Sequence, residues 1–450
     1  MVKGHGSSAQ LALVVVWTLS GPGAGADTFA WKNPPVSGAF NAPSSWQNAD
    51  GHGGFPGAGD FAIFRDGVYT VTCNGASAGM TELIGTVTFQ LDGNYSAGSY
   101  IQGGHPVVLQ GGGTLQTGPF SSLGDGSILV DGSGLAMDNF DFGTSSVQTR
   151  IRGINGAQIK SSAQLNGSTH SLPQPRLESG SSWHHTGALV VNKCFVNGGS
   201  LLAADELNVR AELDGGHLQA GLLKGSGHAI NGSTITAATT SLSDWLLDGS
   251  GNVMTVTGTT VPGLLYADIS VKSGATFSAG ALADNAWYTI DGSGSQLSVG
   301  GVITADGPQK ITIQNLGQGT AASLSKVSLF VRDAGSLFAF SNKAEDSTVL
   351  IQKGGRVNGV HFIGPVRPTV PPAAKSPEPD QPWCCRETWN WAGLGNRRWG
   401  WTVAADWSAP GPSLTAARWA GTPAVPSSAP IPSGSHGRAW PSAIPKESPP

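Results

Sequence analysis

The chain has 450 residues, of which 66 are glycine, and only 12 % are charged. Ordinary globular domains contain about 7 % glycine and about 25 % charged residues. The formal net charge of −4 provides no basic stripe that could neutralise a nucleic-acid backbone, so no nucleic-acid partner is expected. Apolar residues make up 39 %, which is enough for a core and excludes a strongly charged disordered chain.

Residues 1–26 have the organisation of a secretory signal peptide. An apolar run over 11–19 is followed by Ala24-Gly25-Ala26, which is the A-x-A cleavage pattern. The alternative is a membrane anchor, but this nine-residue run is too short to span about 30 Å of hydrocarbon. We therefore expect cleavage after Ala26, a secreted or cell-surface location, and no transmembrane segment in the mature chain.

The remainder divides into four segments. Residues 27–60 are punctuated by Trp, Gly and Pro, residues 61–365 carry short apolar-polar alternations closed by Gly, Asn or Asp, residues 366–382 form a Pro-rich linker, and residues 383–450 form a tail. Alternation over four to six residues predicts half-buried strands joined by turns, and no helix of about ten residues is expected. The stretch from Pro365 onward holds 17 of the 28 prolines, which excludes central strands there.

Two phrases recur in the strand-rich region. Two or three β-formers followed by a Gly-rich corner begin at Val196, Leu213, Val271, Val331 and Ile351, and DGSG occurs at Asp131, Asp248 and Asp291. The last two copies expand to WLLDGSGNV and WYTIDGSGSQ, with their aspartates 43 residues apart. Recurring phrases in a strand-rich chain indicate stacked repeats, since one repeat cannot bury its apolar face alone.

The expected fold is all-β, a parallel and right-handed β-helix or solenoid with an N-terminal cap segment and a disordered Pro-rich tail. Glycine would provide positive φ at its corners. At about 20–25 residues per coil, the region would form about a dozen coils and a rod about 60 Å long. An antiparallel sandwich or barrel is the alternative.

The expanded DGSG phrase resembles the repeats of bacterial autotransporter passengers and related exported β-solenoids. The matching positions are Trp287, Asp291, Gly292, Gly294, Leu297, Gly300 and Gly301, and less completely Trp245, Asp248, Gly249, Gly251 and Gly258. The resemblance implies an exported β-solenoid and is not specific for any one activity. No segment similar to the translocator barrel of autotransporters follows in this chain.

The start of the mature chain is similar to the cap segment of such passengers. The matching residues are Trp31, Gly38, Trp46, Pro56, Gly59 and Asp60, with Phe40 where a Trp is usual. Trp391, Gly395, Trp399 and Trp407 look like a second, damaged copy of the same segment. We interpret the tail as the start of a second solenoid in a truncated or frameshifted chain; a plain disordered tail is the alternative.

Few residues suggest catalysis. Asp138 and Asp141 in MDNFDFG are the candidate catalytic pair, although residues three apart on a strand point to opposite faces unless a bend lies between them. We expect turn aspartates that bond their own backbone. His184 and His185 are adjacent and cannot easily ligate one ion from a strand, so an exposed loop pair is the preferred interpretation.

Metal and redox chemistry have little support. Asp131, Asp248 and Asp291 could supply oxygen ligands to Ca²⁺, but each DGSG corner has one carboxylate, and turn stabilisation is the preferred role. Cys73 and Cys194 are expected to be small buried residues, with pairing left open. No cofactor is expected. We expect a non-catalytic adhesive or matrix protein with glycans or cell-surface components as partners; the alternatives are a polysaccharide lyase or glycosidase, or a carbohydrate-binding spike module.

Overall fold

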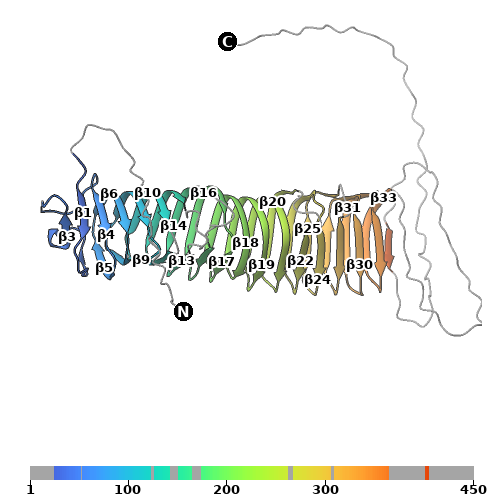
Figure 1. Ribbon diagram of the computed structural model, residues 1–450. Coiled ribbons are helices and arrows are strands. Elements are labelled where there is room, and N and C mark those ends of the chain that lie inside the picture. Colours follow the sequence, from blue (N-terminus) through green and yellow to red (C-terminus); the bar gives the residue numbers. More distant parts are fainter. Residues whose placement is uncertain are drawn as a thin grey trace, which may run out of the picture.

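The computed structural model describes residues 25–51, 53–122, 126–141, 150–164, 174–261, 267–305, 309–363 and 401–404. These residues form a straight rod (Figure 1), a parallel β-solenoid of about 14 turns. They contain no α-helix and one 3-10 turn, η1 (Pro43–Ser45). The expected parallel β-solenoid is confirmed, and the antiparallel sandwich or barrel is excluded because neighbouring coils pair in parallel.

Three ladders of hydrogen-bonded strands run along the rod, and each coil contributes to every ladder. Ladder 1 consists of β5 (Val68–Cys73), β7 (Thr86–Leu91), β9 (Val107–Gly111), β11 (Ser127–Asp131), β13 (Arg150–Ile154), β15 (Gln174–Leu177), β17 (Cys194–Asn197), the ends of β18 (Leu201–Asp214), β19 (His217–Ile230) and β20 (Thr234–Asp248), then β22 (Asp268–Lys272), β24 (Trp287–Asp291), β27 (Lys310–Gln314), β30 (Ser328–Arg332) and β32 (Thr348–Gln352).

Ladder 2 follows ladder 1 in every coil. It consists of β6 (Ala76–Leu83), β8 (Tyr95–Gln102), β10 (Thr114–Ser122), β12 (Gly134–Asp141), β14 (Gln158–Gln164), β16 (Ser182–Val190), the starts of β18, β19 and β20, then β21 (Val253–Thr260), β23 (Thr276–Leu282), β25 (Gln296–Val299), β28 (Gln318–Ala321), β31 (Leu337–Glu345) and β33 (Arg356–Ile363).

Ladder 3 begins with β1 (Thr28–Trp31) and β4 (Phe61–Phe64), which stack in parallel below the second half of β6. Most of its other members are the second halves of ladder 2 strands, which bend at a corner; β26 (Val302–Thr304) and β29 (Ser323–Ser325) are separate strands. Coil length varies, since Leu213 lies beside Ala229, 16 residues later, and Leu247 beside Val271, 24 residues later.

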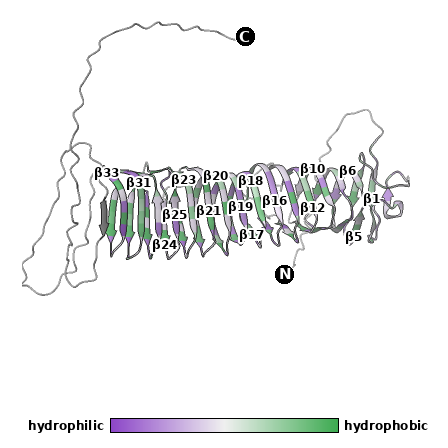
Figure 2. Cartoon of the chain, turned by 180° about the vertical axis from the view of Figure 1, so that it is seen from behind, coloured by the Kyte–Doolittle hydropathy of each residue, from purple (hydrophilic) through white to green (hydrophobic). Residues whose placement is uncertain are grey.

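The core is a continuous stack of apolar side chains inside the coil. Buried and exposed or half-buried residues alternate along the strands. In Figure 2, hydrophobic and hydrophilic colours both occur on the strands along the whole rod. Val71, Phe89, Leu109 and Val130 are register partners in successive coils, and each is fully buried. Complete burial of such a side chain stabilises the fold by roughly 1.5–3 kcal/mol, so the stack supplies the main driving force for folding.

Glycine is used at two corners for two reasons. Between ladders 1 and 2 the chain turns through the left-handed region, as at Gly292 (φ 98°) and Asn155 (φ 54°), which glycine adopts without strain. Between ladders 2 and 3 the coils approach closely: a Cβ on Gly98 would lie 2.5 Å from the carbonyl oxygen of Gly79, and one on Gly118 2.4 Å from that of Gly98. The first reason was predicted from the sequence, and the second was not.

Aromatic rings cover the N-terminal end of the core. Trp31 and Trp46 are buried and pack edge-to-face with centroids 4.9 Å apart, and the Trp46 ring lies 5.4 Å from that of Phe64 in the first coil. Phe40, at the position where the resembled segments usually have Trp, is also fully buried, and its carbonyl oxygen accepts a 2.6 Å hydrogen bond from Trp46 Nε1.

The hydrogen-bonding edge at this end is covered as well. β2 (Gly38–Ala39) extends ladder 1, while β3 (Trp46–Asn48) pairs antiparallel with β1. The antiparallel strand interrupts the parallel stacking, which is a means of preventing edge-to-edge association. Asp60 fixes the end of the loop that follows β3, since its carboxylate accepts hydrogen bonds from the backbone N–H groups of Asp27 and Gly57.

At the other end, β34 (Trp401–Ala404) pairs antiparallel with β33. The first 24 residues, the whole linker and all of the tail except β34 lie outside the described residues. The structure therefore does not test the signal peptide, its cleavage after Ala26, or the second cap-like segment in the tail. In the part of the chain that is described, there is no helix with the length and apolar character needed to cross a bilayer.

Candidate functional site

The three DGSG aspartates end strands of ladder 1 and point outward at the first corner. Asp131 Oδ1 accepts a 2.6 Å hydrogen bond from Asn155 Nδ2 one coil later, and Asp291 Oδ1 accepts a 2.7 Å bond from Asn315 Nδ2. Asp214, outside any DGSG, forms the same 2.6 Å bond with Asn231. The described residues contain no cluster of three or more His, Cys, Asp or Glu that could hold a metal ion.

The three DGSG copies do not form the same turn. After Asp248 and Asp291 the next strand starts five residues later, at Val253 and Gln296, whereas after Asp131 it starts at Gly134. In the longer turns the motif glycines have positive φ, at Gly249 and Gly251 in one copy and at Gly292 and Gly294 in the other. The same four-residue DGSG sequence therefore occurs in turns of two different lengths.

The later motif glycines serve the second corner. The amide N–H groups of Gly300 and Gly301 donate to the carbonyl oxygens of Ala279 and Gly280 in the coil below, at 3.0 and 2.7 Å. A Cβ on Gly301 would lie 2.8 Å from the Gly280 oxygen. Close coil-to-coil contact therefore requires glycine at Gly301, whereas a Cβ on Gly300 would lie 3.8 Å from the Gly280 oxygen, at an ordinary contact distance.

The two motif tryptophans lie on opposite faces of ladder 1. Trp245 is 1 % exposed, lies in the core and donates a 2.9 Å hydrogen bond from Nε1 to the Gly225 carbonyl. A Cβ on Gly227 would lie 2.6 Å from the Trp245 ring, so glycine there makes room for the indole. Trp287 is 39 % exposed on the outer surface.

The candidate pair Asp138 and Asp141 lies at the second corner of its coil. Met137 and Phe140 are buried, Asp138 is exposed and Asp141 is half-buried, so the chain bends between them. The Asp138 carbonyl accepts a hydrogen bond from Ser162 Oγ in the next coil. The bend turns both aspartates out of the core, and Asp138 occupies the corner position that Gly118 holds one coil earlier.

His184 and His185 are not an exposed loop pair, and that prediction is wrong. Both lie on β16, with His184 exposed and His185 buried. His185 Nδ1 lies 2.8 Å from Ser161 Oγ, which also accepts a 2.8 Å hydrogen bond from Trp183 Nε1. Burial lowers the pKa of His185, while its backbone contact with Ala188 and the charge of Asp205 act in the opposite direction. This neutral imidazole is part of the core.

Sequence reasoning missed a second buried polar cluster, around Asp284. Its carboxylate accepts hydrogen bonds from Tyr288 Oη (2.7 Å), Gln309 Nε2 (3.0 Å) and the Ala286 backbone N–H (3.2 Å). Burial raises the pKa of Asp284, and the hydrogen bonds from Tyr288, Ala286 and Gln309 work against that increase. The ring of donors encloses the carboxylate, and this arrangement is typical of a structural acid.

Both cysteines of the described region are buried and unpaired. They lie on β5 and β17 and point into the core. Burial raises the pKa of the Cys194 thiol to about 12 and shifts that of Cys73 in the same direction. Both side chains therefore remain thiols at neutral pH, which excludes thiolate nucleophiles at these two positions.

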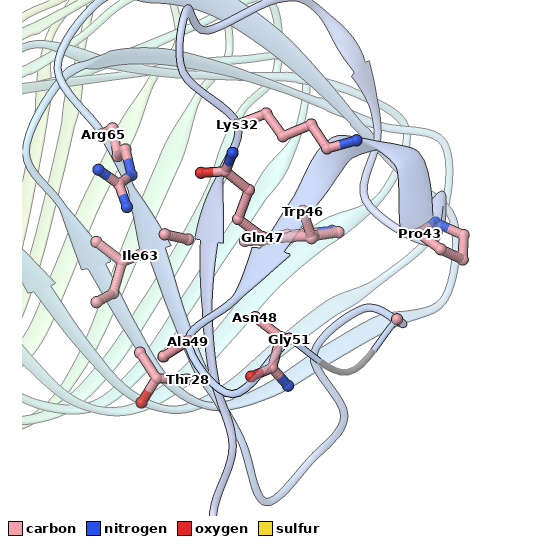
Figure 3. Close-up of a pocket in the computed structure, with 12 residues that line it drawn as sticks. Thr28, Lys32, Pro43, Trp46, Gln47, Asn48, Ala49, Gly51, Ile63 and Arg65 are labelled. Atoms are coloured by element: carbon pink, nitrogen blue, oxygen red, sulfur yellow. The ribbon is translucent and has the colours of Figure 1, made fainter.

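A cavity of about 680 Å³ lies on the cap, over the outer face of β3, β1 and β4 (Figure 3). Lys32, Gln47, Asn48 and Arg65 supply its long polar side chains, and no acidic residue is among those that line it. In Figure 3 the ammonium end of Lys32 points away from the Arg65 guanidinium, so the two groups do not converge on one small anion. The Trp46 ring is buried in the core and offers no face for stacking.

The outer surface of ladder 1 carries two clusters that pair an aromatic ring with cations. In the first, the Phe195 ring lies 4.7 Å from Lys193 Nζ and 5.7 Å from the Arg176 guanidinium carbon. In the second, the Phe330 ring lies 5.1 Å from Lys310 Nζ and 5.8 Å from the Arg332 guanidinium carbon. Lys310 also lies 5.6 Å from the ring of Trp287.

Carboxylates accompany the first cluster. Glu178 pairs with Arg176 and, at 3.1 Å, with Arg152, and Glu212 lies 3.4 Å from Lys193. The pKa of Glu178 is lowered: burial acts to raise it, but the hydrogen bonds and charges of Arg176 and Arg152 prevail. An acid held ionised in this way cannot act as a general acid near neutral pH.

Comparisons with protein-family models, curated proteins and solved structures gave no match for this chain.

Proposed function

We propose that this chain is an exported surface or matrix protein whose solenoid has a non-catalytic, adhesive role. Three observations support the proposal. They are the signal-like residues 1–26, the resemblance of the cap and DGSG phrases to autotransporter passengers, and the rigid rod built by the parallel coils. Fold alone does not determine function, so the proposal depends on which side chains the surface of the rod presents.

The observation that carries the proposal is the outer face of ladder 1, an unbroken sheet from β5 to β32 (Figure 1). Its central outward row is mixed. Hydroxyl side chains at Thr70, Thr88, Ser270 and Thr289 are separated by a run of apolar and charged side chains, among them Leu129, Arg152, Arg176, Glu212 and Leu246. Successive coils lie about 4.8 Å apart. A long outer sheet that presents hydroxyl, apolar and charged side chains in successive coils suits many weak contacts with an extended partner.

Three acids of the described residues also fit a structural role. Asp131 and Asp291 accept hydrogen bonds within corners, and Glu178 is held ionised between two arginines. Glycosidases use two carboxylates in different protonation states across a scissile bond. A polysaccharide lyase or glycosidase is the alternative proposal. It would need a second carboxylate close to Glu178, in addition to the arginines at positions 152 and 176 that pair with it.

The test is a glycan array and a polysaccharide-degradation screen on the purified full-length chain. The proposal predicts binding to a subset of glycans or to a cell surface, with no release of reducing ends or unsaturated products. Release of such products from any polymer would contradict the non-catalytic role.

A further inference from the structure

Two similar surface clusters on ladder 1 differ in their charge balance. In each, a phenylalanine ring lies between two cations. Every cation of the Phe195 cluster has a glutamate within 4.0 Å, whereas neither Lys310 nor Arg332 has an acidic partner within that distance among the described residues. The Phe330 cluster is therefore a local positive site on a chain whose net charge is −4.

Register explains how the Phe330 cluster is assembled. Trp287 on β24 is the direct neighbour of Lys310 on β27, and Lys310 is the neighbour of Ser328, two residues before Phe330. The two aromatic rings thus belong to strands two coils apart, with the ammonium group between them. Trp287 is 39 % exposed and Phe330 is half-buried, so part of each ring faces solvent.

Arg332 adds a second donor on the same face of β30. Its Nε is buried and has no hydrogen-bond partner, which is unusual for a buried donor. The next residue, Asp333, lies 3.9 Å from Lys353 and belongs to a turn. An anion over the ladder would approach Lys310 and the terminal nitrogens of the half-buried Arg332 guanidinium beside the Phe330 ring, since Nε itself is buried.

Nearby carboxylates limit where an anion could lie. Asp268 on β22 is the direct neighbour of Trp287 on the side away from Lys310. Asp291, at the end of β24, accepts hydrogen bonds from Gln314 and Asn315. The positive part of the surface therefore lies over β27 and β30, with the Trp287 ring at its border.

We propose that Trp287, Lys310, Phe330 and Arg332 bind a segment of an acidic polysaccharide. This inference rests on the proposed adhesive role and names the ligand class. The exposed part of the Trp287 ring stacks on a sugar ring. The ammonium and guanidinium groups that flank the Phe330 ring bind carboxylate or sulfate groups, as the cations beside Phe195 bind glutamates. A flat ladder with a repeat of about 4.8 Å suits a linear polymer better than a protein, whose binding hot spots occupy packed, desolvated pockets.

Two acidic polymers show whether the site binds carboxylate or sulfate groups. Polygalacturonate (carboxylate) and dextran sulfate (sulfate) are titrated against the full-length chain by calorimetry, with neutral dextran and duplex DNA as controls. We expect at least one acidic polymer to bind, neutral dextran to bind more weakly, and 300 mM salt to weaken binding because the charges are at the surface.

Matched substitutions test the location. K310Q should weaken binding about fivefold or more through loss of a charge-assisted contact, and W287A should weaken it through loss of the stacking face. K193Q removes the same charge beside Phe195, where Glu212 already balances it, and should leave affinity within about twofold. D268N should strengthen binding, because it removes the negative charge of the residue paired with Trp287 in the ladder. Unchanged melting temperatures show that each variant is folded.

The outcomes separate this inference from the proposed function. Equal binding by K310Q and K193Q, preference for DNA, or binding to neither acidic polymer would overturn the inference. Binding to neutral glycans or cells that is unaffected by K310Q would leave the adhesive role in place while removing this site. Cleavage of either polymer would contradict the proposed function itself.

Discussion

The phrases WLLDGSGNV and WYTIDGSGSQ share a tryptophan and a DGSG turn, yet they place the tryptophan on opposite sides of the same ladder. Trp245 precedes its DGSG aspartate by three residues and Trp287 by four. Since side chains alternate along a strand, a one-residue change in spacing moves the side chain to the other face. With the aspartate pointing outward in both copies, Trp245 enters the core and Trp287 faces solvent.

The neighbours of each tryptophan match its placement. The core position occupied by Trp245 passes to Ile269 and then to Tyr288 in the following coils. Three residues before Trp245 lies the buried Leu242, whereas three residues before Trp287 lies the buried Asp284, which bonds to Tyr288. One phrase thus supports an apolar coil and the other a coil with a buried acid, although the two look like copies in the sequence.

The largest expected contrast is in stability. W245A should lower the free energy of unfolding by about 3–5 kcal/mol, because it empties a core site to which Gly225 and Gly227 have adapted. W287A should change it by less than about 1 kcal/mol, since its ring is partly solvated. Denaturant unfolding followed by circular dichroism measures both. Similar losses in the two variants would refute the opposite placement.

A smaller contrast concerns the two turns. The Asp291 carboxylate accepts hydrogen bonds from Asn315 and Gln314, so D291A should cost about 1–2 kcal/mol. In the other turn the backbone carbonyl of Asp248, rather than its carboxylate, accepts the bond from Asn252 Nδ2. D248A should therefore cost less than about 0.5 kcal/mol. The same unfolding assay applies, and a larger loss in D248A would reverse the assignment of roles.

The smallest contrast is in pH dependence. Burial raises the pKa of Asp284 above its ordinary value of 3.8, so the folded chain holds this proton more tightly than the unfolded chain. The contribution of this group to stability is therefore greatest below pH 3.8 and falls as pH rises through the raised pKa. D284N should remove this decline, whereas L242N in the other coil should lower stability at every pH. Melting temperatures measured between pH 3 and 8 report both effects. If the melting temperature of D284N falls with pH as steeply as that of the unsubstituted chain, the raised pKa of Asp284 is not the cause of the decline.

Much of the fold followed from local patterns. Period-two alternation predicted the strands, and the returning Gly-rich corners predicted stacked coils. The different Trp-to-Asp spacings also predict that Trp245 and Trp287 lie on opposite faces of the ladder. When the two phrases are treated as copies, this difference is not used. Similarly, extending the alternation of β16 through His185 would have placed that ring in the core with Trp183.

Other features depend on residues far apart in the chain. The Asp284 carboxylate accepts one of its hydrogen bonds from Gln309, 25 residues later in the next coil, and no local pattern brings these two residues together. The same holds for Gly118, whose missing side chain is required by the carbonyl oxygen of Gly98 one coil below. The Phe330 cluster also forms only through register, because Trp287 and Arg332 are 45 residues apart in the sequence.

The most direct test of the contrast is ¹⁹F NMR of the full-length chain labelled with 5-fluorotryptophan, with the Trp245 and Trp287 signals assigned by W245F and W287F. The Trp287 resonance should shift between H₂O and D₂O and again on addition of the acidic polymer that binds in the calorimetric titration, while the Trp245 resonance should respond to neither. A solvent-sensitive Trp245, or a Trp287 signal that is insensitive to solvent, would contradict the opposite placement of the two rings.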